Sequence, residues 1–121
     1  MQCPCNKNMN YDQCCKKAHQ NILSVKTAET LMRSRYSAFV LHNIDYLQLS
    51  HHSNTCPSNK EKKEILQWTK SVNWIKLEVI NSTINTVEFK AYFIENGKVD
   101  VIHENSFFKK ENNHWVYLKA F

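Results

Sequence analysis

The sequence predicts an α+β protein in which helices come first, an antiparallel sheet follows, and a short cysteine-rich segment precedes both. Between residues 27 and 69, apolar residues recur at the spacing of one helix face. From residue 74 onward they alternate with polar residues, as in half-buried strands. Four of the five cysteines lie within residues 3–15. We therefore expect a cysteine-rich unit over residues 1–22 and an α+β domain over residues 23–121.

The cysteine-rich segment has the spacing C-x-C-x8-C-C, which favours a metal site over disulfide bonds. Two disulfides here would join cysteines separated by one residue or by none, against a usual Cα separation of ~4.4–6.8 Å. Zinc takes four tetrahedral nitrogen or sulfur ligands, and two ligand pairs around a loop close a compact knuckle. The predicted Zn²⁺ ligands are Cys3, Cys5, Cys14 and Cys15. His19 could replace one of the adjacent pair, because it follows Cys15 by one helical turn.

Three helices are predicted after the cysteine-rich segment. Thr27 can cap the first and Asn43 the second, while Ser58 and Glu61 form a capping-box pattern ahead of the third. The residues expected to face the core are Ala28, Leu31, Met32, Tyr36, Phe39 and Val40 in the first helix, and Ile65, Leu66 and Trp68 or Thr69 in the third.

Strands are predicted over residues 74–80 and 86–94, where apolar and polar residues alternate. Asn96-Gly97 is a strong hairpin signal, and Asn112-Asn113 predicts a further turn into a last strand ending at Phe121. The residues expected to face inward are Ile75, Leu77 and Val79 in the first strand and Val87, Phe89, Ala91 and Phe93 in the second.

Composition limits the class of protein. A chain of 121 residues usually makes one compact domain with a small appendage, and 42% hydrophobic with 22% charged residues is typical of a globular protein. Its apolar runs are too short to span a membrane, and the start lacks the pattern of a secretion signal. We therefore expect a cytoplasmic protein whose thiols stay reduced.

The cysteine-rich segment resembles the SEC-C motif, a zinc-binding element best known from the carboxy-terminal tail of the translocation motor SecA. In that motif a glycine-rich loop follows the second cysteine, and an aromatic residue precedes the closing pair. Tyr11 matches the aromatic, but Asn6, Lys7 and Asn8 replace the usual Gly-Ser-Gly. Asparagine tolerates left-handed backbone geometry better than most residues, so we expect the loop to keep its shape.

The whole chain resembles the bacterial YchJ family, on the blocks MRSRYSAFV at 32–40, IDYL at 44–47, WIKLEV at 74–79 and HENSFF at 103–108. The resemblance implies a SEC-C knuckle followed by a cystatin-like, or nuclear transport factor 2-like, cone of helices packed on a curved sheet. It implies zinc binding but no particular reaction. Members often carry a second knuckle at the carboxy terminus, which this sequence lacks, and the arginine of their HERSRF-like block is replaced here by Asn105 and Phe107.

A cone of this kind encloses a pocket that suits isomerases, dehydratases and binding modules alike. By strand parity with Val99 and Val101, His103 should face the pocket and Glu104 the opposite side. Arg35 is expected either to reach the sheet or to form a salt bridge with Asp45 or Glu104. The candidate pocket residues are Arg35, Tyr36, Tyr46, His52, Trp74, His103 and Glu104.

The favoured function is a binding or adaptor module rather than an enzyme. Its knuckle would dock a protein or ribosomal partner, and its cone would hold a peptide or small ligand. The alternative is a pocket enzyme of the isomerase or dehydratase type with His52 or His103 as general base. The formal charge of +5 falls to about +3 with four thiolates on one Zn²⁺, and the lysines are scattered, so sequence-specific nucleic-acid binding is not expected. Homodimers are common for this fold.

Overall fold

The predicted order of helices followed by strands is confirmed in a computed structural model, which describes residues 1–120; Phe121 lies outside the described residues. A short 3₁₀ helix and a short α-helix form the cysteine-rich segment, and a second 3₁₀ turn leads into the rest of the chain. The elements are η1 (Tyr11–Gln13), α1 (Cys15–Gln20), η2 (Ile22–Ser24), α2 (Ala28–Val40), α3 (Ile44–Leu49), α4 (Asn59–Ser71), β1 (Asn73–Ser82), β2 (Thr86–Glu95), β3 (Lys98–Glu111) and β4 (His114–Ala120).

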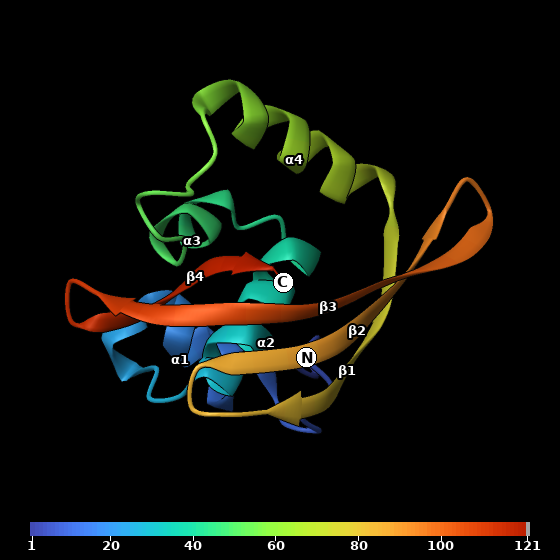
Figure 1. The fold of residues 1–121 in the computed structure, drawn as a ribbon. Coiled ribbons are helices and arrows are strands. Elements are labelled where there is room, and N and C mark those ends of the chain that lie inside the picture. Colours follow the sequence, from blue (N-terminus) through green and yellow to red (C-terminus); the bar gives the residue numbers. More distant parts are fainter. Residues whose placement is uncertain (121) are drawn as a thin grey trace.

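The four strands form one antiparallel sheet in the order β1-β2-β3-β4, which curves around α2 in Figure 1. Both predicted turns are confirmed. Asn96 and Gly97 have φ values of 52° and 78°, and Asn112 and Asn113 have 53° and 68°. Positive φ at both central residues is what a type I′ hairpin turn requires, and its twist matches that of the flanking strands. The sheet is therefore a continuous meander.

Helix α2 lies against the concave face of the sheet and is buried along most of its length (Figure 1). Its predicted apolar face is confirmed, since Ala28, Leu31, Met32 and Tyr36 are buried and Phe39 and Val40 are half-buried. The side expected to be solvated is buried as well, including Ser34, Arg35 and Ser37. This happens because α1 and α3 pack on the sides of α2 that the sheet leaves open.

Helix α4 extends over the open side of the sheet and is only partly buried (Figure 1). The predicted capping box is present, with Ser58 Oγ accepting from Glu61 N and Glu61 Oε1 accepting from Ser58 N. Thr69 is its one buried residue, while Ile65 and Trp68 are half-buried. No helix among residues 1–120 is long and apolar enough to cross a membrane.

The predicted facing of β3 is wrong. Glu104 pairs with buried Phe89 on β2 and points inward, whereas His103 pairs with Lys90 on the outer face. Val99 is 67% exposed, so it gives no reason to place His103 inside. Apolar residues occur on both faces of this strand, and therefore alternation alone could not choose between them. The register with β2 decides it, because β2 buries one clear set of residues.

One of the predicted inward-facing residues of β1 is also wrong. Leu77 is buried and Val79 is half-buried as predicted, but Ile75 is 47% exposed. A β-bulge between Trp74 and Lys76 shifts the register there, so Trp74 takes the inward position and packs against Phe93. A bulge adds one residue to one strand, which reverses the facing of the residues before it.

Replacing Val87 and Val99 by alanine tests this assignment of the sheet faces. Val87 is fully buried on β2, so Val87→Ala should lower the free energy of unfolding by about 2 kcal/mol. Val99→Ala removes the same atoms from an exposed strand position and should change it by no more than about 0.5 kcal/mol. Urea unfolding of both variants measures the difference. Equal losses would show that the outer face of β3 is covered.

Candidate metal centre and cone cavity

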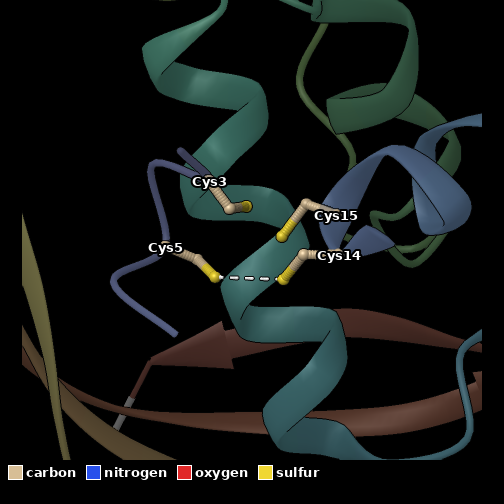
Figure 2. Close-up of side chains that lie close together, drawn as sticks. All are labelled: Cys3, Cys5, Cys14 and Cys15. Atoms are coloured by element: carbon tan, nitrogen blue, oxygen red, sulfur yellow. Dashed lines mark hydrogen bonds between the residues drawn. The ribbon is translucent and has the colours of Figure 1, made fainter. Parts of the chain in front are cut away.

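Four cysteine thiols meet at one point beside α2 (Figure 2). Cys3 and Cys5 come from the amino-terminal segment, whereas Cys14 and Cys15 come from the start of α1. All four sulfur atoms lie within 4.8 Å of one another, and Cys5 Sγ is 3.6 Å from Cys14 Sγ. A tetrahedral site with 2.3 Å zinc–sulfur bonds separates its sulfur atoms by roughly 3.8 Å. The four thiols could therefore hold a metal ion after small side-chain shifts.

Crowding and burial shift the pKa values of the thiols in opposite directions. Hydrogen bonding from Cys15 lowers the pKa of Cys5 to about 5. Burial raises the pKa of Cys14 to about 12, and the same hydrogen bond to Cys5 raises that of Cys15. The cluster thus stabilises one thiolate, and its negative charge opposes ionisation of the neighbouring thiols. A divalent cation removes this conflict, because it replaces the thiol protons and binds the thiolates.

Two asparagines shape the loop between the cysteine pairs. Asn6 and Asn8 have φ values of 64° and 56°, which confirms that they occupy the left-handed positions expected from the resemblance. Asn6 has a further role, since its Oδ1 accepts a hydrogen bond of 2.7 Å from the backbone N–H of Leu77 on β1. Glycine at this position could adopt the backbone angle but could not make this bond. The loop is therefore attached to the edge strand of the sheet.

His19 does not join the thiol cluster. Its Nε2 donates to the carbonyl oxygen of Ser34 at 2.8 Å, and its Nδ1 accepts from the hydroxyl of Tyr11 at 2.6 Å. Burial lowers the pKa of His19, which favours this neutral form. Both ring nitrogens are thus engaged away from the sulfur atoms. The geometry assembles the four-cysteine set and leaves His19 as a link between the cysteine-rich segment and α2.

Two further contacts join the thiol cluster to α2. A hydrogen bond of 3.6 Å joins Cys3 Sγ to the buried hydroxyl of Ser37. Arg33 Nη1 donates to the carbonyl oxygen of Cys5 at 2.8 Å, while Arg33 Nε pairs with Glu29 at 3.0 Å. The division into residues 1–22 and 23–121 stays a prediction. Its two parts nevertheless share buried polar contacts, so the state of the thiols bears directly on α2.

A cavity of about 260 Å³ lies between α2, α3, α4 and the sheet. It is mostly apolar, with Phe39 and Leu47 among the residues that line it. Of the predicted pocket residues, Arg35 and Glu104 line this cavity. The predicted salt bridge of Arg35 is not formed, because no carboxylate of residues 1–120 makes an ion pair with it. Arg35 contacts neutral groups instead.

The other predicted pocket residues lie elsewhere. Tyr46 donates to Ser34 Oγ at 2.6 Å, next to His19. Tyr36 packs edge-on against Trp74 in an aromatic cluster outside the cavity lining. His52 accepts from Asn54 N and lies 3.5 Å from Glu111, and His103 pairs with Glu88 on the outer face of the sheet. The two histidines predicted as bases are therefore far apart in role, because His52 is buried and His103 is exposed.

Sequence reasoning missed five polar residues of the cavity, which are Gln48, His51, Lys62, Ser106 and Tyr117. Burial, followed by the charge on Arg35, lowers the pKa of His51 to about 4, so this imidazole is neutral at neutral pH. Burial raises the pKa of Tyr117. The correct facing of β3 would have placed Ser106 inside together with Glu104. No local signal could have placed His51 or Tyr117, because a bridge between β4 and the segment after α3 brings them together.

The knuckle beside α2 and the helix-covered curved sheet define a class of protein: a cysteine knuckle joined to an α+β cone. Comparisons with known proteins give the same class. The family model described as the middle, NTF2-like domain of YchJ matches residues 27–120. The chain belongs to the YchJ family, also called UPF0225, as predicted from the sequence blocks.

Relatives match beyond that domain. A UPF0225 protein from Vibrio parahaemolyticus is 43% identical, over 96% of this chain and 72% of the relative. One from Photorhabdus laumondii is 40% identical over 96% and 77%. The solution structure of a SEC-C motif containing protein from Rhodopseudomonas palustris matches with a TM-score of 0.83 and 27% identity over 100% of this chain and 98% of that one. The crystal structure of a SEC-C motif containing protein from Psychrobacter arcticus matches with 0.81 and 30% over 98% and 81%.

Glycine replacements at the two asparagines test the link between knuckle and sheet. Asn6→Gly keeps the left-handed backbone but removes the bond to Leu77 N, so it should lower the free energy of unfolding by about 1 kcal/mol. Asn8→Gly is the matched control, because Asn8 Oδ1 accepts only an exposed bond from Gln2, and it should change stability by less than about 0.5 kcal/mol. Urea unfolding distinguishes the two. A loss at position 8 as large as at position 6 would contradict the assigned role.

Proposed function

We propose that this protein is a cytoplasmic, zinc-dependent binding module. Zn²⁺ on Cys3, Cys5, Cys14 and Cys15 holds the knuckle in shape, the knuckle docks a protein or ribosomal partner, and the cone holds a small ligand. The observation that carries the proposal is the meeting of four thiols next to a basic groove on the knuckle surface. A metal site and a docking surface thus share the same short segment.

Zinc is the metal that the donor set favours. Four thiolates in a compact cluster suit a tetrahedral ion without redox chemistry, and structural zinc sites of this composition are closed, with no position for substrate. When bound, Zn²⁺ supplies folding energy and neutralises two of the four thiolate charges. The chain's own residues complete the site, since Ser37 lies beside Cys3 Sγ and Arg33 holds the Cys5 carbonyl.

The groove beside the thiols has the chemistry of a docking surface for acidic groups. It has a volume of about 230 Å³, and Lys7, Met9, Lys17 and Arg33 are among the residues that line it. Met9 is 40% exposed, and Lys7 and Lys17 are exposed and form no ion pair among residues 1–120. An exposed methionine between lysines suits an acidic segment with apolar side chains, such as a protein tail or a ribosomal protein surface.

The enzyme alternative loses its two predicted bases. His52 and His103 do not line the cone cavity: His52 is buried beside Glu111, and His103 pairs with Glu88 on the outer face of the sheet. A general base must come within hydrogen-bond reach of the proton that it removes, which neither histidine does for a molecule in the cavity. The enzyme alternative is therefore left without its predicted bases, and we propose binding as the function of the cone.

Metal content tests the first part of the proposal. Protein purified under reducing conditions should hold about one equivalent of zinc per chain, and Cys14→Ser/Cys15→Ser should hold much less. Chelation should lower the free energy of unfolding by at least about 2.5 kcal/mol, because it removes the folding energy that the metal supplies. At ~4 °C per kcal/mol in a chain of this size, Tm should fall by at least about 10 °C. Cys56→Ser is the control, since Cys56 lies outside the cluster. Substoichiometric zinc in fully reduced wild-type protein would contradict the proposal.

Charge reversal in the groove tests the docking role without touching the metal. Lys7→Glu/Lys17→Glu should lose a partner that wild-type protein recovers in a pull-down analysed by mass spectrometry, because like charges would then face the acidic segment. Lys60→Glu/Lys63→Glu makes the same change in net charge on exposed positions of α4 and should keep the partner. Both double variants should bind zinc normally.

The pull-down also separates docking from a purely structural knuckle. Cys14→Ser/Cys15→Ser should lose the same partner as Lys7→Glu/Lys17→Glu. Retention of every partner by both variants, with zinc lost only from the cysteine variant, would show that the knuckle is a structural staple and that docking occurs elsewhere.

A further inference from the structure

Arg35 is a buried cation whose partners within residues 1–120 are neutral groups. Its Nη1 donates to Leu47 O at 3.0 Å and to Ser50 Oγ at 2.8 Å, and its guanidinium carbon lies 4.9 Å from the centroid of the Tyr117 ring. Burial lowers the pKa of Arg35 to about 10, which still leaves it charged at neutral pH. Burying a charge is costly unless an opposite charge or a full set of hydrogen bonds offsets the lost hydration. Within residues 1–120, no carboxylate does so.

Ser106, on the wall of the same cavity, is a buried polar residue that lacks a hydrogen-bond partner within residues 1–120. The residue is 1% exposed, and its Oγ has no hydrogen-bond partner among residues 1–120. It lies on the inward face of β3, opposite fully buried Val87. Buried hydroxyl groups nearly always have a partner, so an unpartnered one that lines a cavity indicates an acceptor or donor from outside the chain.

The remaining cavity residues define what that molecule must be. Most of the lining is apolar, from Met32 and Phe39 on α2 to Ile65 on α4, which suits a hydrocarbon body. Lys62 adds a second positive charge, and Glu104 is the one carboxylate that lines the cavity within the described residues. His51 is neutral at neutral pH. The cavity thus carries a net positive charge of one, which a single anionic group balances.

We infer that the cone cavity binds a small apolar molecule with one carboxylate group, and that Arg35 is the residue that pairs with this group. The inference deepens the proposed function, since it rests on the cone holding a ligand. A guanidinium presents its N–H groups in a planar fork that matches a carboxylate, and such charged hydrogen bonds are stronger in a dry cavity than in water. Ser106 Oγ donates to the same ligand, so one carboxylate gives Arg35 its counterion and Ser106 its hydrogen-bond acceptor.

Octanoate and octanamide, which have the same chain and differ in charge, are the probes. NMR titration of the zinc-loaded protein should give at least tenfold tighter binding of octanoate than of octanamide. Arg35→Met should remove this preference while the protein stays folded, because a neutral side chain of similar shape takes the place of an unpaired buried charge. Ser106→Ala should weaken octanoate binding about three- to tenfold without lowering the Tm of the free protein, since the lost hydroxyl had no partner.

Glu104→Gln tests whether Arg35 pairs with the carboxylate of a ligand or with that of Glu104. It should tighten octanoate binding several-fold, because it removes a like charge from the cavity wall. His103→Gln, its neighbour on the outer face, should leave the affinity unchanged. Weaker binding in Glu104→Gln, or unchanged octanoate binding in folded Arg35→Met, would overturn the inference.

The two probes also keep the inference distinct from the proposed function. Equal affinity for octanoate and octanamide would overturn the pairing of Arg35 with a carboxylate but leave the cone as a ligand-holding cavity. Absence of binding by both would overturn the inference and the ligand-holding role together, while metal content and the pull-down would still report on the knuckle.

Discussion

The rest of the structure depends on the burial of α2, whose buried serines are satisfied by hydrogen bonds within the fold. This helix is covered on nearly every side, so each polar group on it must find a partner within the fold. Ser34 accepts from Tyr46 and its carbonyl accepts from His19, which joins α2 to α3 and to α1. Ser37 contacts a cysteine of the thiol cluster. Losing any one of these partners would leave a buried polar group unsatisfied, at a cost of about 1–3 kcal/mol.

The same helix separates the two candidate sites and connects them. Ser34 and Ser37 are three residues apart and face the knuckle, whereas Arg35 and Phe39 are four apart and face the cone cavity. A change in the knuckle that moves α2 would therefore also move the wall of the cavity. A rigid helix buried on both sides transmits such a shift more readily than an exposed one, because close packing leaves it little room to relax.

The comparison of sequence and structure shows where pattern reasoning is strong. The thiol cluster, both asparagine turns and the capping box of α4 are local features, each set by residues within one short segment of the chain. The facing of β3 and the bulge at Ile75 are not local. Valines on the outer face of β3 resemble core residues, and only the pairing with β2 shows that they are solvated. The error on His103 followed from this, and it also hid Ser106.

The sequence by itself determined the order of the elements, the family and which four cysteines form the cluster, because spacing, capping and turn chemistry act over short distances along the chain. Only the tertiary structure decided what surrounds each polar side chain. It placed Arg35 in a cavity where no carboxylate of the described residues forms an ion pair with it, paired His19 with Ser34 rather than with the thiols, and brought Tyr117 beside the end of α3. Burial and the absence of a partner are properties of packing between distant segments, and no pattern within one segment encodes them.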